Sequence, residues 1–151
     1  MADEIYREVF KMLREEQSKH TYFLLAASGA AIGFSVTQTQ GMAISWYQVP
    51  LGLAIVSWGL SFYCGSRHLS YVSSNLYANV ELLTVQSGRH SMAGNNPALI
   101  EAASTGIKEA MNTNSDRANR LGHLQFWSLI VGAILYISWH VIEMCLRYHP
   151  N

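Results

Sequence analysis

The feature that most constrains the fold of this chain is a stretch of forty-six consecutive residues, 21–66, without Asp, Glu, Lys, Arg or His. A soluble domain of this size needs charged side chains on the outer faces of its helices, so such a stretch is unusual in water. A helix crosses the hydrocarbon core of a bilayer with about 20 apolar residues, so two crossings and a turn fit here. Residues 38–41 (QTQG) and Pro50 interrupt the stretch where the turn is expected. The sequence therefore predicts a transmembrane hairpin.

Composition narrows the class of protein further. Only 13% of the 151 residues are charged, against roughly 25% in ordinary globular domains, and the length fits one domain. The formal net charge is zero, so no overall field favours nucleic acid. The first residues lack the features of a signal peptide, so the first membrane helix is expected to stay in the mature protein. Cys64 and Cys145 are too far apart in sequence for a metal-binding motif, and neither a metal nor a cofactor is expected.

A third span is predicted near the end of the chain. Leu and Val recur at three- and four-residue steps over residues 69–83, which is typical of a narrow coiled-coil seam. The composition of residues 87–96 indicates a turn, after which Asn96 and Pro97 predict a new helix. Residues 112–116 are polar and allow a local break in that helix. The run LQFWSLIVGAILYISWHVI then predicts the span, with Trp127 and Trp139 suited to its two interfaces.

The predicted fold class is all-α, an integral membrane protein with three transmembrane helices whose cytoplasmic extensions form a helical stalk. Residues 2–20 are amphipathic and helix-forming, and they either continue into the first span or lie on the membrane as an interfacial helix. The chain is treated as a single domain, 1–151. Its predicted parts are an amphipathic cytoplasmic helix at 1–20, spans at 21–40, 50–66 and 124–143, a cytoplasmic helical hairpin at 67–123, and an external tail at 144–151.

The orientation follows from the distribution of Lys and Arg. Nine of the ten lie before the first span or between the second and third spans, and the link between spans 1 and 2 has none. By the positive-inside rule the N-terminus and residues 67–123 are cytoplasmic, and the C-terminus is external. The predicted location is the membrane, and specifically a bacterial inner membrane.

Spans 1 and 2 are rich in small residues that let helix backbones approach closely in lipid. The candidates for helix packing or oligomer contacts are Ala26, Gly29, Ala30, Gly33, Ser57, Ser61 and Gly65. Contact with the other spans of the same chain and contact between protomers both explain such a stripe. The sequence does not separate the two interpretations.

Few residues have the pattern of a reactive site. No Gly-rich phosphate loop, CxxC, HExxH or G-x-S-x-G is present, so no enzymatic activity is predicted. His140 and Glu143 are ionisable groups near the outer end of span 3, where such residues are costly and point to function. At the interface, His140 could instead simply anchor the helix.

Arg117 and His123 lie six positions apart just before span 3. This arrangement resembles the R-x(4–6)-H motif of the HEPN ribonuclease superfamily, whose Arg and His residues meet across a dimer to cleave RNA. The resemblance implies a membrane-tethered ribonuclease. The competing interpretation is a juxtamembrane basic cluster of Arg117, Arg120 and His123 that holds cytoplasmic lipid headgroups.

The overall layout resembles small bacterial membrane effectors of antiviral defence. These include SLATT-type effectors and small membrane accessory proteins of RNA-targeting CRISPR systems, which carry a divergent R-x-x-x-x-H-like motif and form ring-shaped pores. The gap between Arg117 and His123 is one residue longer than in that motif. The resemblance implies a homo-oligomeric, pore-forming or membrane-perturbing protein.

The sequence therefore leads to one main functional hypothesis, a homo-oligomer gated through its cytoplasmic helices by a protein or a signal. The expected partners are the lipid bilayer and further copies of the chain, with no evident small-molecule substrate. The pore-lining candidates are Ser28, Ser35 and Thr39, which follow one face of span 1. The alternative is a non-catalytic accessory subunit that docks into a larger membrane complex through the same small residues.

Overall fold

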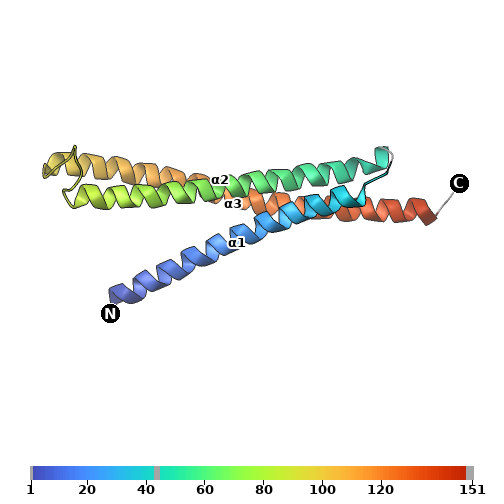
Figure 1. The fold of residues 1–151 in the computed structure, drawn as a ribbon, viewed down its shortest axis with the longest axis horizontal. Helices are drawn as coiled ribbons and strands as arrows, with labels where there is room; N and C mark the ends of the chain where they lie inside the picture. Colours follow the sequence, from blue (N-terminus) through green and yellow to red (C-terminus); the bar gives the residue numbers. More distant parts are fainter. Residues whose placement is uncertain (1, 43–44, 149–151) are drawn as a thin grey trace. The chain divides into compact units, whose positions relative to one another are not determined.

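The structure, a computed structural model, describes residues 2–42 and 45–148, and this part of the chain is helical without any strand (Figure 1). Three long helices follow one another: α1 (Ala2–Gln38), α2 (Val49–Gln86) and α3 (Pro97–Tyr148). A short 3-10 helix, η1 (Trp46–Gln48), precedes α2. The all-α prediction is confirmed.

Helix α1 continues without a break from the charged N-terminal segment into the first apolar run. No Gly or Pro occurs in the chain before Gly29, so nothing interrupts the backbone hydrogen bonding between the two parts. The segment 2–20 is therefore the first part of α1 and does not form a separate helix. After α1 the chain turns with Gly41 at a φ of 81°, a conformation that favours glycine.

The turn between α2 and α3 has the local chemistry that the sequence predicts. Helix α2 ends in a Schellman motif, in which Gly88 N–H donates to Val85 O (3.0 Å) and Arg89 N–H donates to Thr84 O (3.2 Å). Gly88 has a φ of 69°, the left-handed conformation that this motif requires. Asn96 caps α3, because its Oδ1 accepts a hydrogen bond from Ala98 N–H at 3.1 Å. The expected helix restart at residues 96 and 97 is confirmed.

Helix α3 also passes through residues 112–116 without the break that their composition allows. The polar side chains there have partners compatible with a helix. Thr113 donates to Glu109 O within its own helix (3.0 Å). Asn75 of α2 donates through Nδ2 to Met111 O (3.2 Å) and to Ser115 Oγ (2.9 Å). These contacts support the helix where intrinsic propensity is weak.

The chain divides into two units. Unit 1 consists of Met1–Ser66 and Gly122–Asn151, and unit 2 consists of Arg67–Leu121. Unit 2 is a hairpin of segments from α2 and α3 alone. The N-terminal part of α1 is grouped with unit 1, and the stalk of three helices stays a prediction.

The buried residues of unit 1 are as often polar as apolar. Among the described residues, the buried polar ones are Thr21, Ser28, Ser35, Ser61, Gln125 and Ser128, and the buried apolar ones are Leu24, Leu51, Ala54, Trp58, Cys64 and Trp139. Large apolar side chains lie on the outside instead. Those of unit 1 that are more than half exposed include Phe23, Phe34, Val56, Trp127, Ile134 and Ile137. A soluble domain buries mostly apolar side chains, so the high share of polar side chains in the interior of unit 1 is unusual.

Two helical stretches of the described chain, Trp46–Gln86 and Pro97–Arg147, are long and apolar enough to cross a membrane. Core helices of soluble proteins pass the same test of length and composition, but such helices are mostly buried. Here only 33% of the most apolar stretch of α2 and 11% of that of α3 is buried within the structure. Helix α1 does not pass this test, because its many Gly, Ala and Ser residues lower the mean hydropathy of its apolar half.

Candidate functional site

A chain of hydroxyl groups connects all three helices in the interior of unit 1. Ser28 of α1 lies with its Oγ 3.0 Å from Ser61 Oγ of α2, and Ser61 donates to Gln125 O of α3 at 2.8 Å. Ser28 Oγ is also 2.8 Å from Leu24 O, one turn earlier in its own helix. These three side chains have almost no exposure. We call Ser28, Ser61 and Gln125, with the contacts described next, the polar seam.

The polar seam continues in both directions along the helices. On one side, Gln125 Nε2 donates to Thr21 O of α1 at 3.4 Å. On the other, Ser57 donates to Ser128 O at 2.7 Å, and Trp58 Nε1 donates to Leu129 O at 3.3 Å. Every one of these bonds joins two different helices. Where lipid surrounds a bundle, such bonds contribute about 0.6 kcal/mol each on average.

Two glycines let the helices approach closely beside the seam. A Cβ added to Gly65 would overlap the side-chain amide of Gln125 and stand 2.9 Å from Leu25 Cδ2. A Cβ added to Gly132 would overlap the Trp58 indole. The predicted small residues of α2, Ser57, Ser61 and Gly65, therefore serve contacts within one chain.

The predicted small residues of α1, unlike those of α2, point away from the other helices of the chain. Ala26, Gly29, Ala30 and Gly33 are all exposed, and a Cβ added at either glycine would meet no atom within 4 Å. We call these four residues the small-residue face. It lies on α1 beside the inward serines, because Ser28 and Gly29 are neighbours in sequence and point about 100° apart around the helix. One helix thus presents a bonded polar face inward and an open flat face outward.

The three pore-lining candidates are on the inward side or bonded to their own helix. Ser28 and Ser35 are fully buried within unit 1. Thr39 is half-buried, and its hydroxyl lies 3.0 Å from Ser35 O and 3.2 Å from Val36 O. In this conformation neither buried serine hydroxyl faces outward.

Two buried polar atoms of unit 1 have no hydrogen-bond partner among the described residues: Ser35 Oγ and Trp139 Nε1. Trp139 is buried against Tyr136, with ring centroids 5.6 Å apart, whereas Trp127 is exposed as an interfacial residue would be. Tyr136 also hydrogen-bonds through its hydroxyl to Gln38 Oε1 of α1. Trp139 belongs to this aromatic cluster, and its place at a membrane interface stays a prediction.

His140 and Glu143 lie close to this aromatic cluster. The His140 ring stacks on Tyr136 at 6.5 Å between centroids, and Glu143 pairs with Arg147 at 2.6 Å. Two open hollows of about 310 and 490 Å³ share Met42, Glu143 and Arg147 in their linings. Glu143 and Arg147 are one turn apart on α3, and an ion pair at this spacing stabilises the end of a helix. In the described part of the chain, no three His, Cys, Asp or Glu side chains come together as metal ligands do.

Arg117, Arg120 and His123, which the sequence predicts to lie next to the membrane, are all exposed. Arg117 and His123 lie six positions apart in α3 and so point about 120° apart around the helix. In unit 2, Arg117 instead lies over the ring of Tyr71, its guanidinium carbon 6.0 Å from the centroid. His68, which sequence reasoning did not single out, is within 2.8 Å of Ala118 O through Nδ1.

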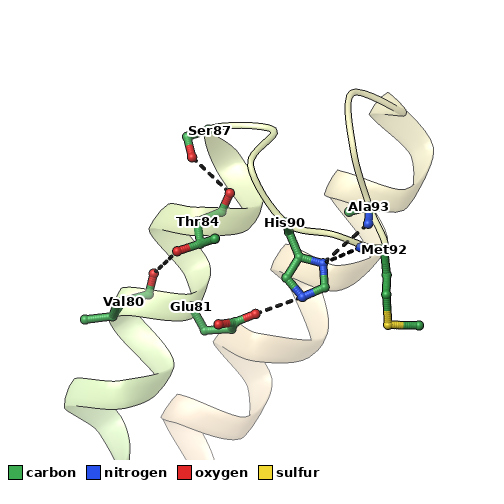
Figure 2. Close-up of polar contacts among 7 residues, drawn as sticks. All are labelled: Val80, Glu81, Thr84, Ser87, His90, Met92 and Ala93. Carbon is green, nitrogen blue, oxygen red and sulfur yellow. Dashed lines mark hydrogen bonds and ion pairs between the residues drawn. The ribbon is translucent and has the colours of Figure 1, made fainter.

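The turn of unit 2 is organised by His90 (Figure 2). Its Nδ1 accepts hydrogen bonds from the backbone N–H groups of Met92 and Ala93, both at 3.3 Å, and its Nε2 is 2.9 Å from Glu81 Oε1. Because Nδ1 accepts, the ring proton is on Nε2 and is donated to Glu81. His90 therefore holds the turn against α2.

Gln125 in the seam and Gly132 beside it are the main residues that the sequence did not single out. Gln125 is a carboxamide at the start of an apolar run, and a polar residue in such a place signals a partner on a neighbouring helix. Comparison of the chain with protein-family models, with curated proteins and with solved structures finds no match.

Proposed function

We propose that this protein is a three-span integral membrane protein that assembles with further copies of itself through the small-residue face of α1. The observation that carries the proposal is the distribution of side chains in unit 1, with hydroxyls and a carboxamide inside and large apolar groups outside. Exposing one large apolar side chain to water costs about 1.5–3 kcal/mol relative to burying it. Several such residues together forgo a free energy comparable to the net stability of a small domain, and lipid around them supplies that contribution.

The proposal that α1 contains a third span is based on the position of α1 in the bundle of unit 1. Its inward residues hydrogen-bond to α2 and α3, so α1 occupies the same depth as the two apolar helices that it contacts. The expected topology is N-terminus in the cytoplasm and C-terminus outside. Single cysteines placed at Ala43 and Asn151 should both react with a membrane-impermeant maleimide added to the outer face. Reaction of the Ala43 cysteine from the cytoplasmic side only would contradict three crossings.

The proposal of self-assembly is based on the flat surface around Gly29 and Gly33. Helices associate in lipid through close van der Waals contact, which small residues four positions apart allow. A second copy of the same face fits this surface, since two flat faces are self-complementary in an isologous contact. Homo-oligomerisation then needs no residue that already serves the polar seam.

The size of the purified particle tests the assembly. We expect the wild type in detergent or nanodiscs to contain several copies, and Gly29→Leu with Gly33→Leu to shift it towards the monomer. Gly59→Leu is the matched control, because Gly59 is also an exposed helical glycine with no atom within 4 Å of an added Cβ. A wild type with one copy per particle would contradict self-assembly and favour an accessory subunit of a larger complex.

Pore formation is a second candidate function, and the polar seam is the observation that favours it. The groups that could line a hydrated path face one another inside the bundle, so conduction requires the three helices to separate. Ser28→Cys with Ser61→Cys, in a chain without Cys64 and Cys145, should form a disulfide that locks the bundle. Dye leakage from liposomes should then stop on oxidation and return on reduction. Wild-type liposomes that never leak would contradict the pore.

A further inference from the structure

Two arginines converge on one tyrosine in unit 2. The guanidinium carbon of Arg67, from α2, lies 5.4 Å from the centroid of the Tyr71 ring, and that of Arg117, from α3, lies 6.0 Å from it. Both are cation–π distances. Two helix segments thus bring two permanent positive charges to one aromatic ring, although fifty positions separate them in sequence.

Neither arginine forms an ion pair with another described residue. The described ion pairs join Lys19 to Glu16, His90 to Glu81 and Arg147 to Glu143, and none involves Arg67 or Arg117. Asp116 is next to Arg117 in sequence and so points about 100° away around α3. Two like charges near one ring repel each other, and an anion between them removes that repulsion.

The phenol of Tyr71 adds a hydrogen-bonding group. Hydrogen bonds with Arg117 and then with Arg67 lower the pKa of Tyr71 from its ordinary value, as expected for a hydroxyl beside two cations. The planar guanidinium matches the oxygens of a phosphate group, to which it can donate two parallel hydrogen bonds.

We propose that Arg67, Tyr71 and Arg117 form a binding site for the phosphate group of an anionic ligand. The two guanidiniums hold the phosphate oxygens, and the Tyr71 ring positions both side chains. The expected source is an anionic phospholipid, because Arg67 directly follows the uncharged stretch 21–66 and Arg117 precedes span 3. The lipid source rests on the proposed membrane location, whereas the anion site itself does not.

The test uses the purified full chain in detergent and calorimetric titration with two probes, dioctanoyl phosphatidylglycerol and inorganic phosphate. Arg67→Gln with Arg117→Gln should raise the Kd for phosphatidylglycerol at least tenfold. The matched control is Arg89→Gln with Lys108→Gln, which removes the same charge from two other exposed positions of unit 2 and should change the Kd less than twofold. Tyr71→Phe should keep most of the affinity, because the ring remains, and Tyr71→Ala should lose it.

The two probes distinguish the sources of the phosphate. Phosphatidylglycerol binding that millimolar inorganic phosphate does not displace identifies a lipid, and displacement at that concentration identifies a soluble phosphate. Equal loss of affinity in the control variant, or no binding of either probe by the wild type, would overturn the site. A failure of the membrane location would show separately, in the cysteine labelling at Ala43 and Asn151.

Discussion

The hydroxyl groups of Ser28 and Ser61 lie 3.0 Å apart in the interior of unit 1, and through them α1 is connected to α2 and then to the backbone of α3. In lipid such bonds contribute modestly, because the unfolded reference state also finds partners, but the two bonds of Ser61 fix which faces of the three helices meet. The polar seam is for this reason a feature of the fold of one chain, and the small-residue face of α1 lies outside it.

Buried serines of the seam and beside it should respond differently to loss of the hydroxyl. Ser61→Ala should lower the free energy of unfolding by about 1 kcal/mol, because it removes the link between three helices. Ser35→Ala should leave it unchanged or raise it, since the Ser35 hydroxyl is buried without a partner among the described residues. Reversible unfolding in mixed detergent micelles measures both. Ser138→Ala is the control, because that exposed hydroxyl bonds only to Ile134 O of its own helix. Equal destabilisation by all three changes would contradict the seam.

The sequence predicts the helices and the turn well, because these depend on local chemistry. The cap at Asn96 and the glycine at Gly88 act within a few residues of themselves, and the structure has both. The sequence does not show which side of α1 contacts the other helices, because Ser28 and Gly29 belong to two adjacent stripes that repeat with the same period. Serines in an apolar helix suggested a pore lining, but a hydroxyl buried in lipid is satisfied equally well by a neighbouring helix of the same chain. Only the pairing of Ser28 with Ser61 in three dimensions distinguishes a pore lining from a contact within one chain.

Two glycines of unit 1 test the packing, because substitution by alanine should lower the stability at one of them and keep or raise it at the other. Gly132→Ala should destabilise the protein by about 1–3 kcal/mol, because the added Cβ overlaps the buried Trp58 indole. Gly59→Ala should be neutral or stabilising by about 0.5–1 kcal/mol, since alanine favours the helix and the site is open. Thermal unfolding in detergent measures the difference. Tolerance of Gly132→Ala with loss of stability in Gly59→Ala would show that the helices pack differently.

His90 should protect the turn of unit 2 from hydrogen exchange. His90→Ala removes the acceptor of the Met92 and Ala93 amides, so these two amides should exchange about fivefold faster, as each bond contributes about 1 kcal/mol. Ser91→Ala changes an exposed side chain in the same turn and should have little effect. Hydrogen–deuterium exchange with mass spectrometry resolves this peptide. Unchanged exchange in His90→Ala would mean that another group holds the turn.

The ribonuclease interpretation makes the opposite prediction to ours. Arg117 and His123 point about 120° apart on α3, and the guanidinium of Arg117 lies over the ring of Tyr71. We expect purified wild-type protein to leave a labelled RNA intact in the presence of EDTA. Cleavage by the wild type that disappears in Arg117→Ala with His123→Ala would establish a metal-independent nuclease.

The most direct test of the account is cysteine cross-linking at two neighbouring positions of α1 in native membranes. In a chain without Cys64 and Cys145, Gly29→Cys should form a disulfide-linked dimer on mild oxidation, because residue 29 lies on the exposed face proposed to meet a second copy. Ser28→Cys should stay monomeric, because residue 28 is buried against α2 of its own chain. Dimer formation is read from the mass on a non-reducing gel. A dimer formed by Ser28→Cys and not by Gly29→Cys would contradict both the facing of α1 and the proposed assembly.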